Sequence, residues 1–149
     1  MKIYFAGPLF SEAEKKFNFN LTKKLESLGF KVYLPQRDGV EKNKPPYNTM
    51  QPDERRKALF ELDKKQILGS EIFLFVLDGR VPDEGACVEL GIAYAHRDLL
   101  TVKKHLVGFM TDQRAAFVGS KLNPMLKIPL DFIAEDEKSL LEYLSKLKK

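Results

Sequence analysis

The sequence has few of the residues that build cross-linked or metal-stabilised proteins. Its 149 residues include one cysteine, two histidines and no tryptophan. A single cysteine cannot build a disulfide framework, and together with two histidines it does not complete a structural zinc site. We therefore expect a reducing, cytoplasmic environment and no bound metal.

Long apolar runs are also missing. The longest, residues 72–77, is far too short to cross a bilayer, and residues 3–6 alone do not provide the apolar region of a signal peptide. The net charge of +4 comes from 25 basic and 21 acidic residues, and the lysines are scattered. A solvated surface explains this charge, so we expect neither a nucleic-acid nor a membrane partner.

Strand and helix patterns alternate along the chain, which at this length and with 44% hydrophobic residues is expected to form one domain over residues 1–149. Strands are expected at 2–6, 30–34, 72–77, 105–110 and 128–133. Helices are expected at 11–29, 53–68, 83–96 and near the C-terminus, and the stretches 35–52 and 111–124 have no periodicity. The alternation predicts a doubly wound, flavodoxin-like (Rossmann-like) α/β fold with a mostly parallel five-stranded sheet and helices on both faces.

Two helix starts have recognisable signals. Ser11 and Glu14 have the spacing of a capping box. Asp53 is expected to cap the second helix, with Leu59 and Ile67 on its apolar side. Ligands of such folds bind beyond the carboxyl ends of the strands, where the strand order reverses.

Two carboxylates occupy positions that disfavour charge. Asp63 lies on the apolar face of its predicted helix, and Glu89 lies within a helix segment that is otherwise uncharged. The residues that share the helix face of Glu89 are all small: Gly85, Ala86 and Ala93. Desolvation raises the pKa of such groups into a range useful for proton transfer. Structural roles remain open, as a cap or ion-pair partner for Asp63 and as half of a buried salt bridge for Glu89.

Other polar residues are expected at the same strand ends. Tyr4 on the first strand is placed to hydrogen-bond a carboxylate, although a buried strand tyrosine is ordinary. Asp83 and Glu84 begin a helix, and capping explains one of them. Gly7-Pro8 lacks the spacing of a dinucleotide fingerprint and the chain has no phosphate-binding loop motif, so no nucleotide cofactor is expected. Two desolvated carboxylates in an α/β cleft suggest glycosyl chemistry, with a nucleophile and an acid/base.

Three segments resemble the nucleoside 2-deoxyribosyltransferase family: KIYFAGP at residues 2–8, the helical Asp63, and DEGACVELG at residues 83–91. The likeness covers about residues 2–126. It implies that the protein salvages nucleosides without a metal or cofactor, by exchanging the 2-deoxyribosyl group between purine or pyrimidine bases. The implied reaction is a retaining ping-pong exchange through a covalent deoxyribosyl ester of Glu89, with hydrolysis as a side reaction.

The resemblance also implies roles for single residues. Asp63 is the expected acid/base and base-contacting group, and Tyr4 is expected to orient Glu89. Gln36 resembles a nucleobase-contacting glutamine of the family, and Arg114 is a further candidate at the border of the cleft. The remaining residues expected to bind substrate are Gly7, Asp83, Glu84 and Asn123.

The segment Asn123-Pro124-Met125 resembles an Asn-x-Met segment with which family members complete the site of a neighbouring subunit. We therefore expect a homo-oligomer, at least a dimer. The expected ligands are 2′-deoxynucleosides and free nucleobases.

Two other functions stay open. A sister group hydrolyses 2′-deoxynucleoside 5′-monophosphates and carries a serine six residues before the catalytic glutamate, where this chain has Asp83. A carboxylate beside a phosphate is unfavourable, which favours nucleosides as substrates. The second alternative is a nucleoside-binding sensor without turnover, which would not require a nucleophile aimed at C1′.

Overall fold

The computed structural model describes residues 1–112 and 122–148. Its five parallel strands form one sheet in the order β2-β1-β3-β4-β5. The strands are β1 (Lys2–Ala6), β2 (Lys31–Tyr33), β3 (Ile72–Val76), β4 (His105–Phe109) and β5 (Phe132–Ala134). This is the flavodoxin-like order, which reverses between β1 and β3. The predicted fold class is confirmed, and the sheet is parallel throughout.

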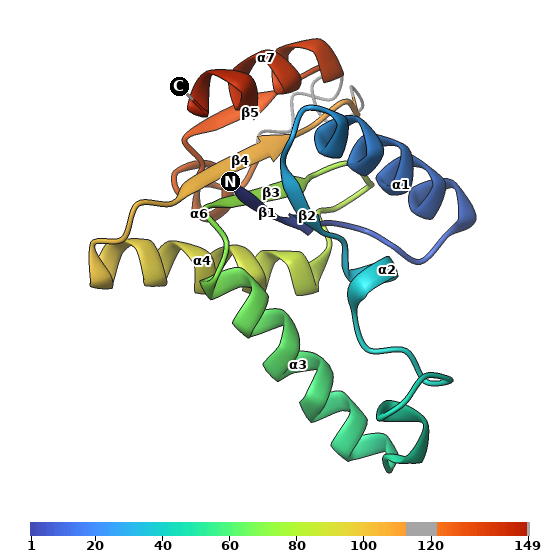
Figure 1. Cartoon of the computed structure of the whole chain (residues 1–149). Coiled ribbons are helices and arrows are strands. Elements are labelled where there is room, and N and C mark those ends of the chain that lie inside the picture. Colours follow the sequence, from blue (N-terminus) through green and yellow to red (C-terminus); the bar gives the residue numbers. More distant parts are fainter. Residues whose placement is uncertain (113–121, 149) are drawn as a thin grey trace.

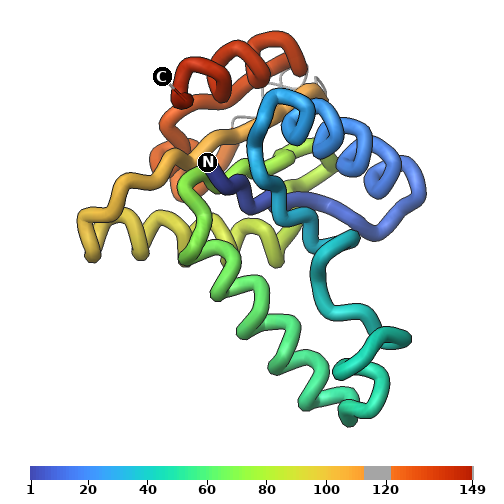
Figure 2. The backbone as a smooth tube through the Cα atoms, viewed as in Figure 1, coloured from blue at the N-terminus to red at the C-terminus, as the bar shows by residue number. Residues whose placement is uncertain are grey.

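Helices cover both faces of the sheet (Figure 1). They are α1 (Glu12–Ser27), α2 (Pro35–Asp38), α3 (Pro52–Leu68), α4 (Glu84–Leu100), α6 (Pro124–Lys127) and α7 (Glu137–Leu147), with a 3-10 turn η1 at Tyr47–Thr49. α1 and α7 lie on one face, α3 and α4 on the other, and the N-terminal part of α3 extends away from the sheet (Figures 1 and 2). Within the described residues, no helix is both long and apolar enough to span a membrane.

The strands divide the core into two apolar clusters. On the α1/α7 side, Ile3 and Phe5 of β1 pack with the buried leucines of both helices. On the α3/α4 side, Tyr4 packs with residues that include Ala86, Leu90 and Ala93 of α4. Successive strand residues point to opposite faces. This alternation directs Tyr4 to the side that carries α3 and α4.

The two predicted helix caps have different outcomes. The capping box at Ser11 is confirmed, because its hydroxyl accepts from the Glu14 backbone and the Glu14 carboxylate accepts from the Ser11 backbone. The prediction that Asp53 caps α3 is wrong. The N-cap is Gln51, and Pro52 takes the first helical position. Proline fits there because its fixed φ is helical and that position needs no N–H donor.

Other boundaries also differ from expectation. The prediction that Leu59 faces the core is wrong: it is 46% exposed, because the N-terminal part of α3 lies beyond the sheet (Figure 1). α4 continues to Leu100 rather than ending at His96. The last strand is Phe132–Ala134 rather than 128–133, because residues 128–129 form the turn that follows α6.

Candidate active site

Tyr4 and Glu89 meet beside the central strands. The Tyr4 hydroxyl donates a hydrogen bond to Oε1 of Glu89 at 2.7 Å, and the Tyr4 side chain is fully buried. Glu89 lies in the second turn of α4, the helix that follows β3. Since β3 pairs with β1, the first turns of α4 lie near the strand that carries Tyr4. The point where the sheet order reverses therefore holds a phenol bonded to a carboxylate.

A second tyrosine–carboxylate pair lies next to the first. The hydroxyl of Tyr33, the last residue of β2, donates to Oδ1 of Asp63 on α3 at 3.1 Å. The Cα partners Tyr4 and Tyr33 stack with ring centroids 5.6 Å apart. On the other side of Tyr4, its Cα partner Phe73 of β3 also stacks on the Tyr4 ring, with ring centroids 5.7 Å apart. Three adjacent strands thus present a row of aromatic rings, two of which hold carboxylates.

Burial changes the proton affinity of both carboxylates. It raises the pKa of Glu89 to about 7; the Tyr4 hydrogen bond opposes this change, and the charges of Asp63 and Asp83 add to it. Burial also raises the pKa of Asp63, against the hydrogen bond from Tyr33. Burial and the carboxylates raise the pKa of both tyrosines, so both remain donors at neutral pH.

In the described part of the chain, no cationic side chain pairs with either carboxylate, as the salt-bridge alternatives would require. Neither Asp63 nor Glu89 belongs to an ion pair there. Each of them instead receives a tyrosine hydroxyl on one oxygen. The arrangement can supply Glu89, whose pKa lies close to neutral pH, and Asp63 as a second carboxylate that can exchange protons.

The start of α4 adds negative charge to this site. Asp83 is the N-cap, and its carboxylate accepts from the backbone N–H of Ala86 at 2.8 Å. Glu84 lies exposed in the first turn.

Gly7, directly after β1, has a φ of +149°, and a Cβ there would lie 2.9 Å from the Cβ of Val76. Gly7 therefore allows the ends of β1 and β3 to approach closely.

Two other predicted site residues are engaged elsewhere. The Gln36 amide faces α1, where Nε2 donates to the carbonyl of Lys15 at 2.8 Å and Oε1 accepts from Asn18 at 3.1 Å. Asn123 caps α6 by accepting from the Met125 backbone at 2.9 Å. Within the described residues, no hydrogen bond joins either of them to the tyrosine–carboxylate pairs. Arg114 lies outside the described residues.

Sequence reasoning missed Tyr33. Its neighbour Val32 points to the α1/α7 side, so alternation places Tyr33 on the side of Tyr4. This alternation is visible in the sequence. It points to Tyr33 only when β2 is known to pair with β1 in the register that sets Tyr4 opposite Tyr33.

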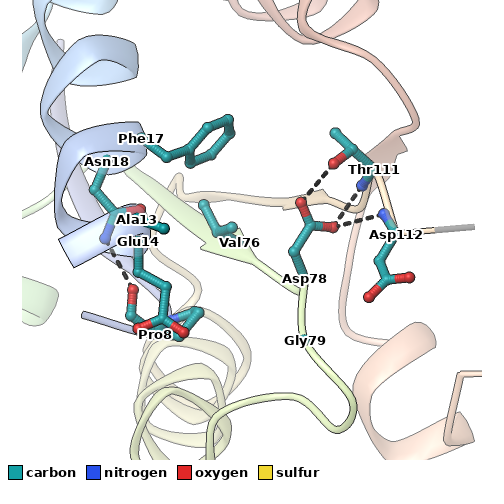
Figure 3. Close-up of a pocket in the computed structure, with 10 residues that line it drawn as sticks. All are labelled: Pro8, Ala13, Glu14, Phe17, Asn18, Val76, Asp78, Gly79, Thr111 and Asp112. Carbon is teal, nitrogen blue, oxygen red and sulfur yellow. Dashed lines mark hydrogen bonds between the residues drawn. The ribbon is translucent and has the colours of Figure 1, made fainter. Parts of the chain in front are cut away.

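A cavity of about 410 Å³ lies on the α1 side, at the ends of the same strands (Figure 3). Asp78 in its wall accepts from the backbone and hydroxyl of Thr111 and from the backbone of Asp112. Asn18 donates to the carbonyl of Pro8 at 2.9 Å. The cavity does not include the two carboxylate pairs. In the part of the chain that the structure describes, no group of three or more His, Cys, Asp or Glu residues is placed to hold a metal ion.

A family model and several solved structures match the chain. The family model described as nucleoside 2-deoxyribosyltransferase matches residues 3–142. The chain is similar to a conserved protein from Enterococcus faecalis V583, with 27% identity and a TM-score of 0.75 over 100% of this chain and 99% of that one. It is also similar to a 2-deoxyribosyltransferase from Bacillus psychrosaccharolyticus, with 25% identity and a TM-score of 0.74 over 94% of this chain and 90% of that one.

A 2-deoxyribosyltransferase from Leishmania mexicana shares the fold, with 20% identity and a TM-score of 0.60 over 97% of both chains. No curated protein sequence matches.

Proposed function

Because the chain belongs to the nucleoside 2-deoxyribosyltransferase family, we propose that it exchanges the deoxyribosyl group between bases of 2′-deoxynucleosides by double displacement at Glu89. The observation that best supports this is the 2.7 Å hydrogen bond from Tyr4 to a desolvated Glu89, beside the partly buried Asp63. A nucleophile held by one oxygen keeps the other for attack, and a second carboxylate can serve the leaving base.

In the first half-reaction, Tyr4 holds Oε1 of Glu89 while Oε2 attacks C1′ of the nucleoside. The C1′–N bond breaks, and its electron pair goes to the nucleobase. Asp63, protonated, gives its proton to the base nitrogen. The products are a neutral base and a deoxyribosyl ester of Glu89.

The second half-reaction reverses these roles. An incoming base attacks C1′ of the ester, Glu89 leaves as a carboxylate, and Asp63 takes a proton from the base. Two inversions at C1′ give net retention. Water attacking in place of the base would give hydrolysis, so exclusion of water decides the ratio of transfer to hydrolysis.

The proposed substrates are nucleosides with a free 5′-hydroxyl. Asp83 caps α4 close enough to Glu89 for its charge to raise the pKa of that carboxyl, and a 5′-phosphate would be repelled by the same charge. A 2′-hydroxyl would crowd Glu89 and withdraw electrons from the oxocarbenium-like transition state. Deoxyribose is therefore the preferred sugar.

We further propose that Asn123 completes the site of a neighbouring subunit. It caps α6, on which Met125 is 80% exposed, and Ile128 directly after the helix is 76% exposed. Large apolar side chains this exposed are suited to an interface between copies of the chain. Light scattering coupled to gel filtration should give at least a dimer.

The decisive experiment is one incubation of deoxyinosine with and without adenine, followed by chromatography. We expect deoxyadenosine with adenine present and slow release of hypoxanthine without it. Faster base release from dAMP or dGMP than from the nucleosides would favour the hydrolase. Binding in calorimetry without base release would favour a sensor.

A further inference from the structure

Tyr33 takes no part in the half-reactions above, yet it makes a specific contact with their acid/base. It ends β2, is 8% exposed, and donates its hydroxyl to Oδ1 of Asp63. In the described part of the chain this is the one hydrogen bond that the Asp63 carboxylate receives. Asp63 is partly buried, and a carboxylate with one donor has one oxygen bound and one available.

We propose that Tyr33 is a positioning residue that binds Oδ1 of Asp63 and leaves Oδ2 as the oxygen that exchanges a proton with the nucleobase. This inference rests on the proposed function of Asp63. It assigns to Tyr33 the same task for Asp63 that Tyr4 has for Glu89.

The sheet fixes where the Tyr33 hydroxyl lies. Tyr33 and Tyr4 are Cα partners in the parallel pairing of β1 with β2, and their rings stack with an interplanar angle of 18°. Asp63 and Glu89, in contrast, are on two different helices, α3 and α4. Two adjacent tyrosines therefore hold both carboxylates relative to the same pair of strands. Such positioning matters because reacting groups must be held within a fraction of an ångström.

The hydroxyl can serve Asp63 in both of its protonation states. When Asp63 is ionised, Tyr33 donates to Oδ1 and stabilises the charge. When Asp63 is protonated on Oδ2, the same donation to Oδ1 continues. Removing the hydroxyl should thus raise the pKa of Asp63 and free the carboxylate to rotate.

The titratable surroundings of this pair come from several elements. Asp38 of α2 and Tyr47 of η1 act on Tyr33, and so does Asp63 itself. The charge of Asp63 in turn acts on Tyr4 and Glu89. A change in the charge of Asp63 should therefore also be felt by Glu89, whose pKa the charge of Asp63 raises.

The test is Tyr33→Phe, which keeps the ring and its stacking on Tyr4. We expect kcat for exchange to fall about tenfold with a smaller change in KM, since proton transfer from a held group contributes to the transition state. The limb of the pH profile that depends on Asp63 should move to higher pH. Tyr143→Phe is the matched control, because Tyr143 of α7 also stacks, on Phe132 at 4.2 Å. It should change neither quantity.

Two further variants keep the test decisive. In an Asp63→Asn background, Tyr33→Phe should have no additional effect if Tyr33 acts through Asp63. If Tyr33→Phe does not fold, 3-fluorotyrosine placed at position 33 keeps ring and hydroxyl. It is a stronger donor and should move the same limb to lower pH.

A carbon-13 titration of the Asp63 carboxyl in the free protein separates this inference from the proposed function. We expect a higher pKa in Tyr33→Phe than in the unaltered protein. An unchanged Asp63 titration together with an unchanged pH profile would overturn the role of Tyr33. If the unaltered protein neither exchanges nor releases bases, the proposed function fails. The Tyr33 contact is judged separately: it is overturned if the pKa of Asp63 is the same in Tyr33→Phe as in the unaltered protein.

Discussion

Lys104 is a buried and Glu89 a largely desolvated charged side chain, and Lys104 lies before the start of a strand whereas Glu89 lies on the helix that follows the end of one. Lys104 precedes β4 and is 4% exposed; its ammonium group donates to the carbonyl of Ile67 at 2.8 Å, to Oγ of Ser70 at 3.1 Å and to the carbonyl of Ser70. Glu89 follows β3 and receives one hydrogen bond, from Tyr4, among the described residues.

The difference lies in how completely each charge is satisfied. All three hydrogens of Lys104 have acceptors, and although burial lowers its pKa to about 8, it stays protonated at neutral pH. Glu89 has one oxygen bound, and burial raises its pKa to about 7, so it gains and loses a proton near neutrality. A buried charge with complete bonding supports the fold, whereas one with an open position is available for chemistry.

Glu89→Gln should have the largest effect. We expect exchange between deoxyinosine and adenine to fall by about three orders of magnitude or more, because the amide is not a nucleophile. Product formation within tenfold of the unaltered protein would exclude Glu89 as the nucleophile.

The same variant should not lose stability. The pKa of Glu89 is higher in the folded state than its ordinary value of 4.5, so ionising it costs folding free energy as the pH rises through this range. Relative to the unaltered protein, Glu89→Gln should gain about 1–3 kcal/mol at pH 8 and less at pH 5. Thermal unfolding at both pH values measures this; equal stability changes at both would contradict the account.

Lys104→Met should show the opposite behaviour. It removes the ammonium donor from the carbonyls of Ile67 and Ser70, and we expect a loss of about 1–3 kcal/mol of unfolding free energy. The exchange rate per folded molecule should not change. Urea unfolding provides the measurement, and Lys103→Met, at an exposed neighbour, is the control. Loss of activity without loss of stability would remove the distinction between the two charges.

Tyr4→Phe should have a moderate effect. The Tyr4 hydroxyl lowers the pKa of Glu89, so its removal should raise that pKa further and leave less nucleophile ionised. At pH 6 the exchange rate should fall about tenfold, with a smaller loss at pH 8. A uniform loss at all pH values would show that Tyr4 acts on something other than the charge of Glu89.

Asp83→Ser should have the smallest effect on rate and a change in preference. Serine also caps helices, so stability should stay within about 0.5 kcal/mol. Without the Asp83 charge, base release from dAMP should increase relative to release from deoxyadenosine. A ratio that does not change would show that Asp83 does not exclude the phosphate.

The fold was predictable where local patterns suffice. β3 is apolar at every position and all five of its residues are buried, and the capping box at Ser11 is a local signal. The cap of α3 was misread because the proline at the first helical position moves the helix start, and Leu59 was misplaced because helical periodicity does not reveal where the sheet ends.

The sequence singles out Asp63, Glu89 and Tyr4, and the structure places the hydroxyl of Tyr4 on Glu89; it does not single out Tyr33, which binds Asp63. Asp63 and Glu89 stand out in the sequence because charge is unexpected on apolar or small helix faces. Tyr33 and Lys104 do not stand out, because their roles depend on strand register and on which loops meet at the sheet edge. Strand register and the meeting of loops are features of the tertiary structure, which local sequence patterns do not reveal.

The most direct test of the central claim is the mass of the protein after acid quenching during incubation with deoxyinosine and no acceptor base. We predict a fraction of the protein heavier by one deoxyribosyl group, which peptide mapping places on Glu89 and which disappears when adenine is added. Exchange that proceeds with no such adduct, or with the adduct on another residue, would contradict the account.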